Sequence, residues 1–347
     1  MRLIQFETSD EKRRVGIIEG ERALDLTATL PECPRILDLF FASRRAGVSL
    51  AAFVRQHLDQ GKRPTEFSYP ELLASPPRSG RAFLRPPLDH PDPYHLLISG
   101  TGLTHTGSMQ ARDDMHTVPD SDAPKSDSAK MFEMGLSGGK PEPGRRGAAP
   151  EWFYKGNGAV LRGHREWLDI PAFALGAGEE PEIVGCYVID EAGIPCRLGF
   201  ALGNDWSDHA TERINYLYLA PSKLRTCAVG PELNLDCDFQ SIRLRCKVTR
   251  QTETLYDSDW LASGERHMCH SLANCEDHHF KYPQHRLPGA VHLHFFGTSK
   301  LSYGSRNWEY QTGDEIEVAA PEFSASLVNS VRQLPGEAAQ PVAVAVM

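Results

Sequence analysis

From residue 151 almost to its C-terminus, the chain repeats short runs of β-forming residues separated by Gly, Pro and Asp turns. The clearest runs are "CYVID", "RLGFALG", "IRLRCKVTR", "AVHLHFFGT" and "DEIEVAA". Short strands at this spacing, with few helical patterns between them, are typical of a mainly antiparallel architecture. The sequence therefore predicts a mainly β (α+β) fold for the larger part of the chain.

The first residues have a different organisation. Three strand-like runs, "RLIQFET", "RVGIIEG" and "RALDLT", precede the segment "RILDLFFASRRAGVSLAAFVRQHLD", whose apolar residues have helical spacing broken near Gly47. The proline-rich segment "PPRSGRAFLRPPLDHPDP" follows and marks a boundary. We therefore expect a small N-terminal α/β domain at residues 1–80 and a larger domain at residues 81–347.

Composition narrows the possible partners. A net charge of -9 among 347 residues argues against nucleic-acid binding, which needs clustered Lys and Arg. No apolar run approaches the roughly 20 residues that span a membrane, and the start lacks a signal-peptide pattern. The eight cysteines form no Cys-x-x-Cys pair, which favours reduced thiols. We expect a cytoplasmic protein that binds neither nucleic acid nor a membrane.

The segment "GAGEEPEIVGCYVID" begins a strand with three acids. Residues i and i+2 of a strand share a face, so Glu180 and Glu182 would lie side by side while Pro181 points away. Two carboxylates that close repel one another unless a cation lies between them. Glu179 has no such companion and is expected to be a solvated neighbour. A solvated strand end is the alternative for any single Glu-x-Glu.

A second acidic segment makes the cation more plausible. The turn "DEAG" folds the chain back, and the returning strand of "GFALGNDWSDHATE" ends at Asp205. A hairpin places the end of its second strand beside the start of its first, so Asp205 would reach Glu180 and Glu182. Three converging carboxylates suit a hard divalent cation such as Mg²⁺, with Mn²⁺ or Ca²⁺ as alternatives.

With these segments in place, the sequence resembles the fumarylacetoacetate hydrolase superfamily. The matching segments are "EPEIV", "GFALGNDWSDH" and "PSKLRTCAVGPEL", together with "MRLIQFE", "FYKGNGAV" and the late "FFGT" and "TGDEIEV". The resemblance implies a rolled β-sheet core, a homodimer and a divalent metal held by Glu180, Glu182 and Asp205.

The resemblance also implies further site residues. Lys155 and Lys223 match lysines of the superfamily that lie beside the metal, where a lysine can pair with a substrate carboxylate or transfer a proton. Thr298 matches a Gly-Thr turn and would bind the substrate carboxylate. Glu180 would take part in catalysis as well as in metal binding.

One departure from the superfamily pattern bears on the reaction. Its hydrolases have a histidine and a glutamate where this chain has Ser108 and Ala111. The chain looks closest to the 2-keto-3-deoxy-sugar-acid (arabinonate) dehydratases of the superfamily, which lack that pair. We therefore expect dehydration of a 2-oxo sugar acid such as 2-keto-3-deoxy-L-arabinonate to 2-oxoglutarate semialdehyde. Polar residues Ser108, Arg112 and Asp113 would close over the substrate.

Two other functions stay open at this point. A metal-dependent C–C hydrolase of an acylpyruvate would need another base, such as His105 or His116. A non-catalytic protein that binds sugar acids would keep the fold without turnover. The pair His292 and His294 has the spacing of two zinc ligands on one strand face, but no third ligand follows at a recognised spacing, so a structural role is favoured.

Overall fold

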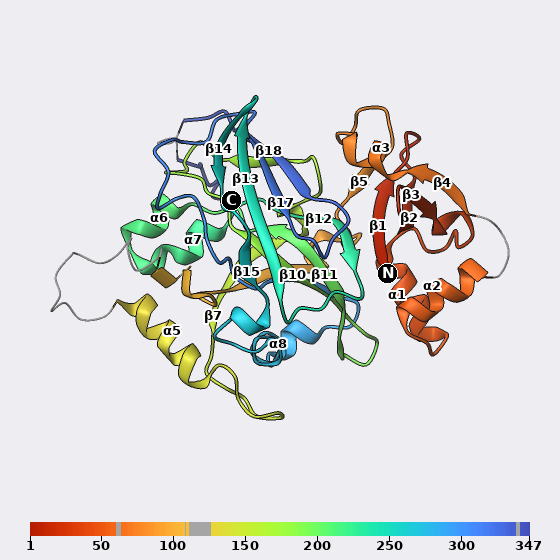
Figure 1. The fold of residues 1–347 in the computed structure, drawn as a ribbon, viewed down its shortest axis with the longest axis horizontal. Helices are drawn as coiled ribbons and strands as arrows, with labels where there is room; N and C mark the ends of the chain where they lie inside the picture. The colour runs from red at the N-terminus through yellow and green to blue at the C-terminus, as the bar shows by residue number, and fades with distance from the viewer. Residues whose placement is uncertain (60–63, 108, 111–125, 338–340) are drawn as a thin grey trace.

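The computed structural model describes residues 1–59, 64–107, 109–110, 126–337 and 341–347, and strands dominate it (Figure 1). Among these residues, the larger of two mixed sheets has 12 strands and the smaller has six. The predicted mainly β fold is confirmed. The strands of the larger sheet are β1 (Arg2–Glu7), β2 (Arg13–Glu19), β3 (Arg22–Asp25), β4 (Thr65–Ser68), β5 (Phe83–Arg85), β6 (Leu96–Gly102), β7 (Glu151–Asn157), β8 (Leu161–Arg162), β10 (Pro181–Ile189), β11 (Pro195–Asn204), β12 (Cys227–Asn234) and β16 (Val291–Phe295).

The smaller sheet has the order β14-β13-β17-β18-β9, with β15 paired to β13. It packs on the larger sheet through a core that contains Ile183 and Phe200 from one side and Leu244 and Val318 from the other, all of them buried. Strands β10 and β11 contribute to this core and, through Val184 and Ala201, to a second buried cluster, so they lie between two hydrophobic layers. The strands are β9 (Trp167–Ile170), β13 (Ile242–Arg250), β14 (Glu253–Asp257), β15 (Leu261–Ser263), β17 (Glu315–Ala319) and β18 (Leu327–Gln333).

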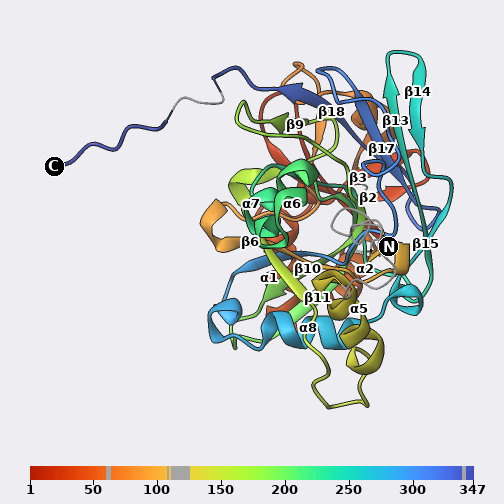
Figure 2. The same cartoon turned by 90° about the vertical axis from the view of Figure 1, so that its left-hand side faces the viewer.

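Helices are short and lie at the margins of the sheets (Figures 1 and 2). The two helices expected around Gly47 are present as α1 and α2, and α1 buries the apolar face that includes Ile36 and Phe40. The α-helices and the one 3₁₀ turn used below are α1 (Ile36–Arg45), α2 (Leu50–Asp59), α3 (Tyr69–Ala74), α5 (Asp127–Gly138), α6 (His209–Ile214), η4 (Tyr216–Tyr218), α7 (Leu219–Lys223) and α8 (Leu272–Phe280).

The N-terminal elements lie at one side of the molecule (Figure 1). Their sheet continues into the larger one, because β1 pairs antiparallel with β12 at Leu3 and Leu233. Leu3 and Leu233 also belong to one buried cluster together with Val184 of β10. The division at residue 80 stays a prediction, but the two parts share a sheet and a core.

The segment between β6 and β7 contains a helix that sequence reasoning did not predict. Helix α5 begins after Ser126, whose side chain accepts a hydrogen bond from the backbone N–H of Ala129, and it buries Phe132. Among the described residues, no helix has the length and apolar character to span a bilayer.

Candidate metal centre

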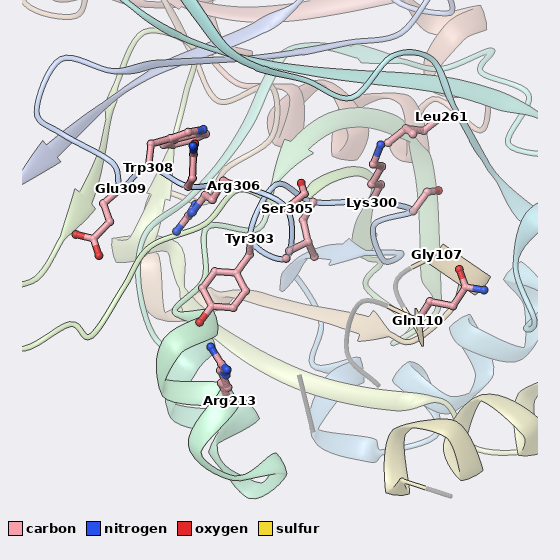
Figure 3. A pocket seen from close by; sticks show the side chains of 14 residues that line it. Gly107, Gln110, Arg213, Leu261, Lys300, Tyr303, Ser305, Arg306, Trp308 and Glu309 are labelled. Carbon is pink, nitrogen blue, oxygen red and sulfur yellow. The ribbon is translucent and has the colours of Figure 1, made fainter. Parts of the chain in front are cut away.

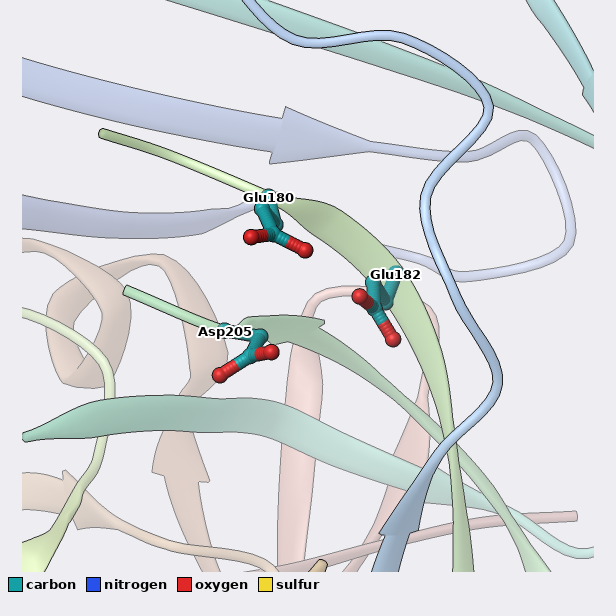
Figure 4. A group of neighbouring side chains, drawn as sticks. All are labelled: Glu180, Glu182 and Asp205. Carbon is teal, nitrogen blue, oxygen red and sulfur yellow. The ribbon is translucent and has the colours of Figure 1, made fainter. Parts of the chain in front are cut away.

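The β10–β11 hairpin brings three carboxylates together (Figure 4). Pro181 is the first residue of β10 and pairs with Asn204, the last residue of β11. Beyond this pair, the backbone N–H of Asp205 donates to the carbonyl of Glu180 over 3.0 Å. Ligand oxygens of Glu180, Glu182 and Asp205 all lie within 4.8 Å of one another, so the structure groups the three acids that the sequence singled out.

The chemistry of this group fits a hard divalent cation. All three side chains are buried, and Oε1 of Glu182 has no hydrogen-bond partner among the described residues. Burial, followed by the charges of Asp205 and Glu180, raises the pKa of Glu182 well above its ordinary value. Leaving a buried carboxylate oxygen unpaired is costly, whereas a divalent cation takes oxygen ligands of this kind. Glu180, Glu182 and Asp205 are the residues that would hold it.

Lys223, at the end of α7, lies against two of the acids. Its Nζ donates to Oε1 of Glu180 over 2.6 Å, to Oδ2 of Asp205 over 2.8 Å and to the hydroxyl of Ser207 over 3.0 Å. Burial acts to lower the pKa of Lys223, but Asp205 and Glu180 outweigh it and raise the pKa. The lysine therefore stays charged beside the acids.

Lys155 reaches the same group from β7. Its Nζ is 2.7 Å from Oδ1 of Asp205 and also donates to the carbonyl of Trp206. Lys155 is fully buried, and burial, only partly offset by Asp205, lowers its pKa. The two lysines therefore differ: one is held in the charged form, and the other is shifted toward the neutral form that can accept a proton.

His209 completes the surroundings of Glu180, and sequence reasoning did not include it. It is the first residue of α6 and buried, and its Nε2 lies 2.9 Å from Oε1 of Glu180. Gly178 permits this position, because a Cβ there would lie 2.2 Å from Nδ1 of His209. Its place in "GNDWSDH", four residues after Asp205, is the sequence signal that could have found it.

Comparison with known proteins places this geometry in context. No family model matches the chain. A curated protein from Haloferax volcanii, named probable 2-keto-3-deoxyxylonate dehydratase, is 26% identical over 243 residues, covering 67% of this chain and 71% of that protein. The solved structure of a 2-keto-3-deoxy-D-arabinonate dehydratase complexed with magnesium and 2,5-dioxopentanoate covers 97% of this chain and 100% of its own at a TM-score of 0.69 and 17% identity.

The chain has the fumarylacetoacetate hydrolase fold. The fold implied by the resemblance is thereby confirmed, and the chain is similar in sequence or in fold to proteins named as 2-keto-3-deoxy-sugar-acid dehydratases. A 5-carboxymethyl-2-hydroxymuconate delta-isomerase from Mycobacterium smegmatis has a similar fold at a lower TM-score of 0.55, with 15% identity, 97% of this chain covered and 100% of its own.

In this fumarylacetoacetate hydrolase fold, Thr298 lies beside the group of three carboxylates formed by Glu180, Glu182 and Asp205. The preceding residue, Gly297, donates its backbone N–H to Oε2 of Glu182 over 2.6 Å. Thr298 itself is buried, and its hydroxyl donates to the carbonyl of Lys300 over 3.0 Å. The position is compatible with the substrate contact that the superfamily resemblance implies.

The expected lid residues Ser108, Arg112 and Asp113 lie outside the described residues, as does His116. His105 is described and buried, with Nδ1 2.8 Å from the hydroxyl of Thr104. Burial, with a smaller contribution from His267, lowers its pKa to about 3. This value makes His105 a very weak base near neutral pH.

The expectation that Glu179 is solvated was wrong. Its side chain is fully buried and accepts hydrogen bonds from Ser302 and Tyr310. The partners come from residues far along the chain, so the local alternation that governs Glu180 and Glu182 gave no sign of them.

His292 and His294 lie on β16 in a buried histidine cluster. Nδ1 and Nε2 of His294 bond the hydroxyls of Ser99 and Thr101 at 2.9 and 2.7 Å, and Nδ1 of His292 bonds His279 at 2.9 Å. In the described part of the chain, Glu180, Glu182 and Asp205 are the one group of three or more potential ligands with the spacing of a metal site. The structural role favoured for His292 and His294 agrees with these contacts.

Proposed function

We propose that the chain is a Mg²⁺-dependent dehydratase of a 2-keto-3-deoxy-pentonate that forms 2-oxoglutarate semialdehyde. The observation that carries the proposal is the buried group of Glu180, Glu182 and Asp205, with an unpaired oxygen on Glu182 and a lysine on either side. Relatives by sequence and by fold are named as dehydratases of such acids, and one is complexed with magnesium.

A bound Mg²⁺ would polarise the 2-keto group and stabilise the negative charge that develops when carbon 3 loses a proton. Lys155 is the proposed base for this proton, because burial favours its neutral form. Lys223 stays charged and would pair with the substrate carboxylate. The hydroxyl of Thr298 would turn from the carbonyl of Lys300 to donate a hydrogen bond to the same carboxylate. Loss of hydroxide from carbon 4 completes the elimination of water, and the product then tautomerises to the semialdehyde.

The test is a direct assay. A 2-keto-3-deoxy-pentonate has one stereocentre, carbon 4, so both enantiomers should be incubated with the purified protein and Mg²⁺, and the semialdehyde measured by NMR. We expect one enantiomer to be converted and chelation to stop the reaction. No semialdehyde from either enantiomer with Mg²⁺, Mn²⁺ or Ca²⁺ would contradict the proposal.

The same protein sample separates the alternatives. Release of pyruvate from acetylpyruvate or fumarylpyruvate would indicate C–C hydrolysis. Calorimetric binding of a sugar acid without turnover under any divalent metal would indicate a binding protein. The low pKa of His105 gives the hydrolase no effective base at that residue.

We further propose a homodimer that forms around β7, the last strand of the larger sheet as described. Trp152 and Tyr154 alternate outward from this strand, with side chains 39% and 42% exposed. The hydroxyl of Tyr216 donates to Glu151 over 2.8 Å, which brings η4 and its 79% exposed Leu217 beside the strand. Exposed apolar side chains gathered beside the last strand of a sheet are typical of an interface, and a second copy of the chain would cover them.

Light scattering after size exclusion tests the assembly. We expect a dimer of the wild-type protein and a shift toward monomer for Leu217→Glu. A wild-type monomer at micromolar concentration would rule out this interface.

A further inference from the structure

The loop of residues 297–310, between β16 and β17, is fastened to the segment that leads into β10. Gly297 donates to Glu182, and Nη2 of Arg306 donates to the carbonyl of Ala177 over 2.6 Å. Glu179 holds the loop at Ser302, which lies between these two points, and at Tyr310, which is the last residue of the loop. The segment that contributes Glu180 and Glu182 to the three carboxylates therefore also holds the 297–310 loop.

Glu179 is the central attachment. Its Oε1 accepts from the backbone N–H of Ser302 over 2.6 Å, and its Oε2 accepts from the hydroxyls of Ser302 and Tyr310 over 2.9 and 2.6 Å. A carboxylate with no exposure to water is costly, and hydrogen bonds from three donors offset that cost. The bonds to Ser302 fix both the main chain and the side chain of the loop.

Arg306 supports the same arrangement. Nη1 lies 4.0 Å from Oε2 of Glu179, and the guanidinium carbon lies 5.3, 5.2 and 5.1 Å from the ring centres of Tyr303, Trp308 and Tyr310. Contacts between a guanidinium and aromatic faces are favourable, more so when they are shielded from water. The charge of Arg306 is thus placed opposite Glu179 and inside the loop.

The attachment of the loop to Glu179 determines which loop residues lie near the three carboxylates. Thr298 lies between the attachments at Gly297 and Ser302, and Tyr303, next to Ser302, lies against His209 with 5.1 Å between ring centres. The outer side of the loop lines an open pocket of about 940 Å³ together with Arg213 of α6 (Figure 3). In Figure 3, Tyr303 points from the loop toward Arg213.

We propose that Glu179 is a positioning residue, which fixes the 297–310 loop so that Thr298 and Tyr303 are held at the site where the substrate binds. The proposal rests on the proposed function for its kinetic consequence. Glu179 holds the loop and contributes no ligand to the metal, so its loss should weaken substrate binding and turnover far more than metal binding.

Glu179→Gln tests this, with Glu191→Gln as the control because Glu191 is exposed at the turn between β10 and β11 and does not line the pocket of Figure 3. Losing hydrogen bonds to a buried charge costs enough to predict a KM at least about tenfold higher, with a lower kcat. The Kd for Mg²⁺, measured by calorimetry, should change less than about threefold, a difference of about 0.65 kcal/mol. Hydrogen exchange should rise in peptides from 298–306 and stay unchanged in β10. Glu191→Gln should match the wild type in all three measurements.

Tyr310→Phe removes one of the three donors and keeps the ring, so it should give an intermediate effect and remains usable if Glu179→Gln fails to fold. Unchanged exchange at 298–306, or a loss of Mg²⁺ binding as large as the loss of substrate binding, would overturn the positioning role. Hydrogen exchange and Mg²⁺ binding can both be measured without any turnover of substrate. If the wild type converts no 2-keto-3-deoxy acid, the proposed function fails while these two measurements still decide the role of Glu179.

Discussion

His209 and Glu180 form a buried pair in which Nε2 of the histidine lies 2.9 Å from Oε1 of the carboxylate. Burial acts to raise the pKa of Glu180, but Lys223 and then His209 outweigh it and lower the pKa well below the ordinary value. The carboxylate is therefore charged and fixed in orientation before any cation arrives. Groups that orient a metal ligand in this way commonly affect affinity for the metal.

Replacing Gly178 by Ala should displace His209. The new Cβ would lie 2.2 Å from Nδ1, so the ring must move and its contact with Glu180 is lost. We expect Mg²⁺ affinity, measured by calorimetry, to fall by about 10- to 100-fold, as for other groups that orient metal ligands.

His209→Ala should have a similar effect, and the double variant Gly178→Ala/His209→Ala should be no worse than His209→Ala alone. Additive losses in the double variant would show that Gly178 acts through something other than His209.

Glu182→Gln should abolish Mg²⁺-dependent activity and leave the fold intact. Because the folded protein raises the pKa of Glu182, its contribution to stability without metal is complete below the pKa of the unfolded chain. It is lost as the pH rises from there toward the raised pKa of the folded protein. Metal-free Glu182→Gln should therefore be at least as stable as the wild type at pH 8. Mg²⁺ at about a hundred times its Kd should add about 2.7 kcal/mol to the wild type and nothing to the variant, measured by urea unfolding. Glu191→Gln, exposed at the turn of the same hairpin, is the control.

Lys223→Met should destabilise the metal-free protein by about 3–5 kcal/mol, because it leaves Glu180 and Asp205 charged and without their shared partner. Mg²⁺ would offset the same charges, so we expect it to stabilise this variant more than it stabilises the wild type. Urea unfolding with and without Mg²⁺ measures both effects, and Lys12→Met, at an exposed lysine, should change neither. An equal Mg²⁺ effect in the two proteins would place the cation elsewhere.

Lys155→Met should act on the chemical step. Removing a positioned proton-transfer group lowers rates by about 10²- to 10⁴-fold. We expect kcat to fall in that range while calorimetry still detects Mg²⁺ binding. A variant that keeps kcat within about threefold of the wild type lies far outside that range and would exclude Lys155 as the base.

The histidine cluster predicts sensitivity to acid. Burial, followed by His292 and His285, lowers the pKa of His294 to about 3. The folded protein resists protonation of His294. The contribution of His294 to folding stability is therefore present above the unfolded pKa of about 6.5 and is lost as the pH falls below that value. Between pH 7 and pH 5, wild type should lose about 2 kcal/mol more than His294→Gln. Urea unfolding at both pH values measures it, with exposed His95→Gln as control; equal losses would contradict it.

Local patterns were sufficient for the hairpin that carries the carboxylates. Alternation in "EPEIVGCYVID" and the turn at "DEAG" determine which residues share a face and where Asp205 returns. Helices α1 and α2, in the N-terminal part of the chain, were predictable for the same reason, since their apolar periodicity is local.

Contacts over long distances in sequence were not predictable in this way. Glu179 was expected to be solvated because nothing near it in the chain pairs with it, and its donors at Ser302 and Tyr310 are brought in by the packing of a later loop. Helix α5 was missed because Gly135 and Gly138 weaken its local signal, while Phe132 and the cap at Ser126 support it.

The pairing of β1 with β12 has a consequence for the order of synthesis. On the edge of β1 that faces away from β2, strand β5 covers Gln5–Glu7, but the partner of Arg2 and Leu3 is β12, which begins at Cys227. Most of the chain must therefore leave the ribosome before the start of the first strand is covered on that side. Pairings so distant in sequence are slow to form because the intervening loop must close first. Until then, the start of β1 at Arg2 and Leu3 is an open strand edge that can recruit other chains. A nascent chain that stalls before residue 227 should therefore depend on chaperones to remain unaggregated.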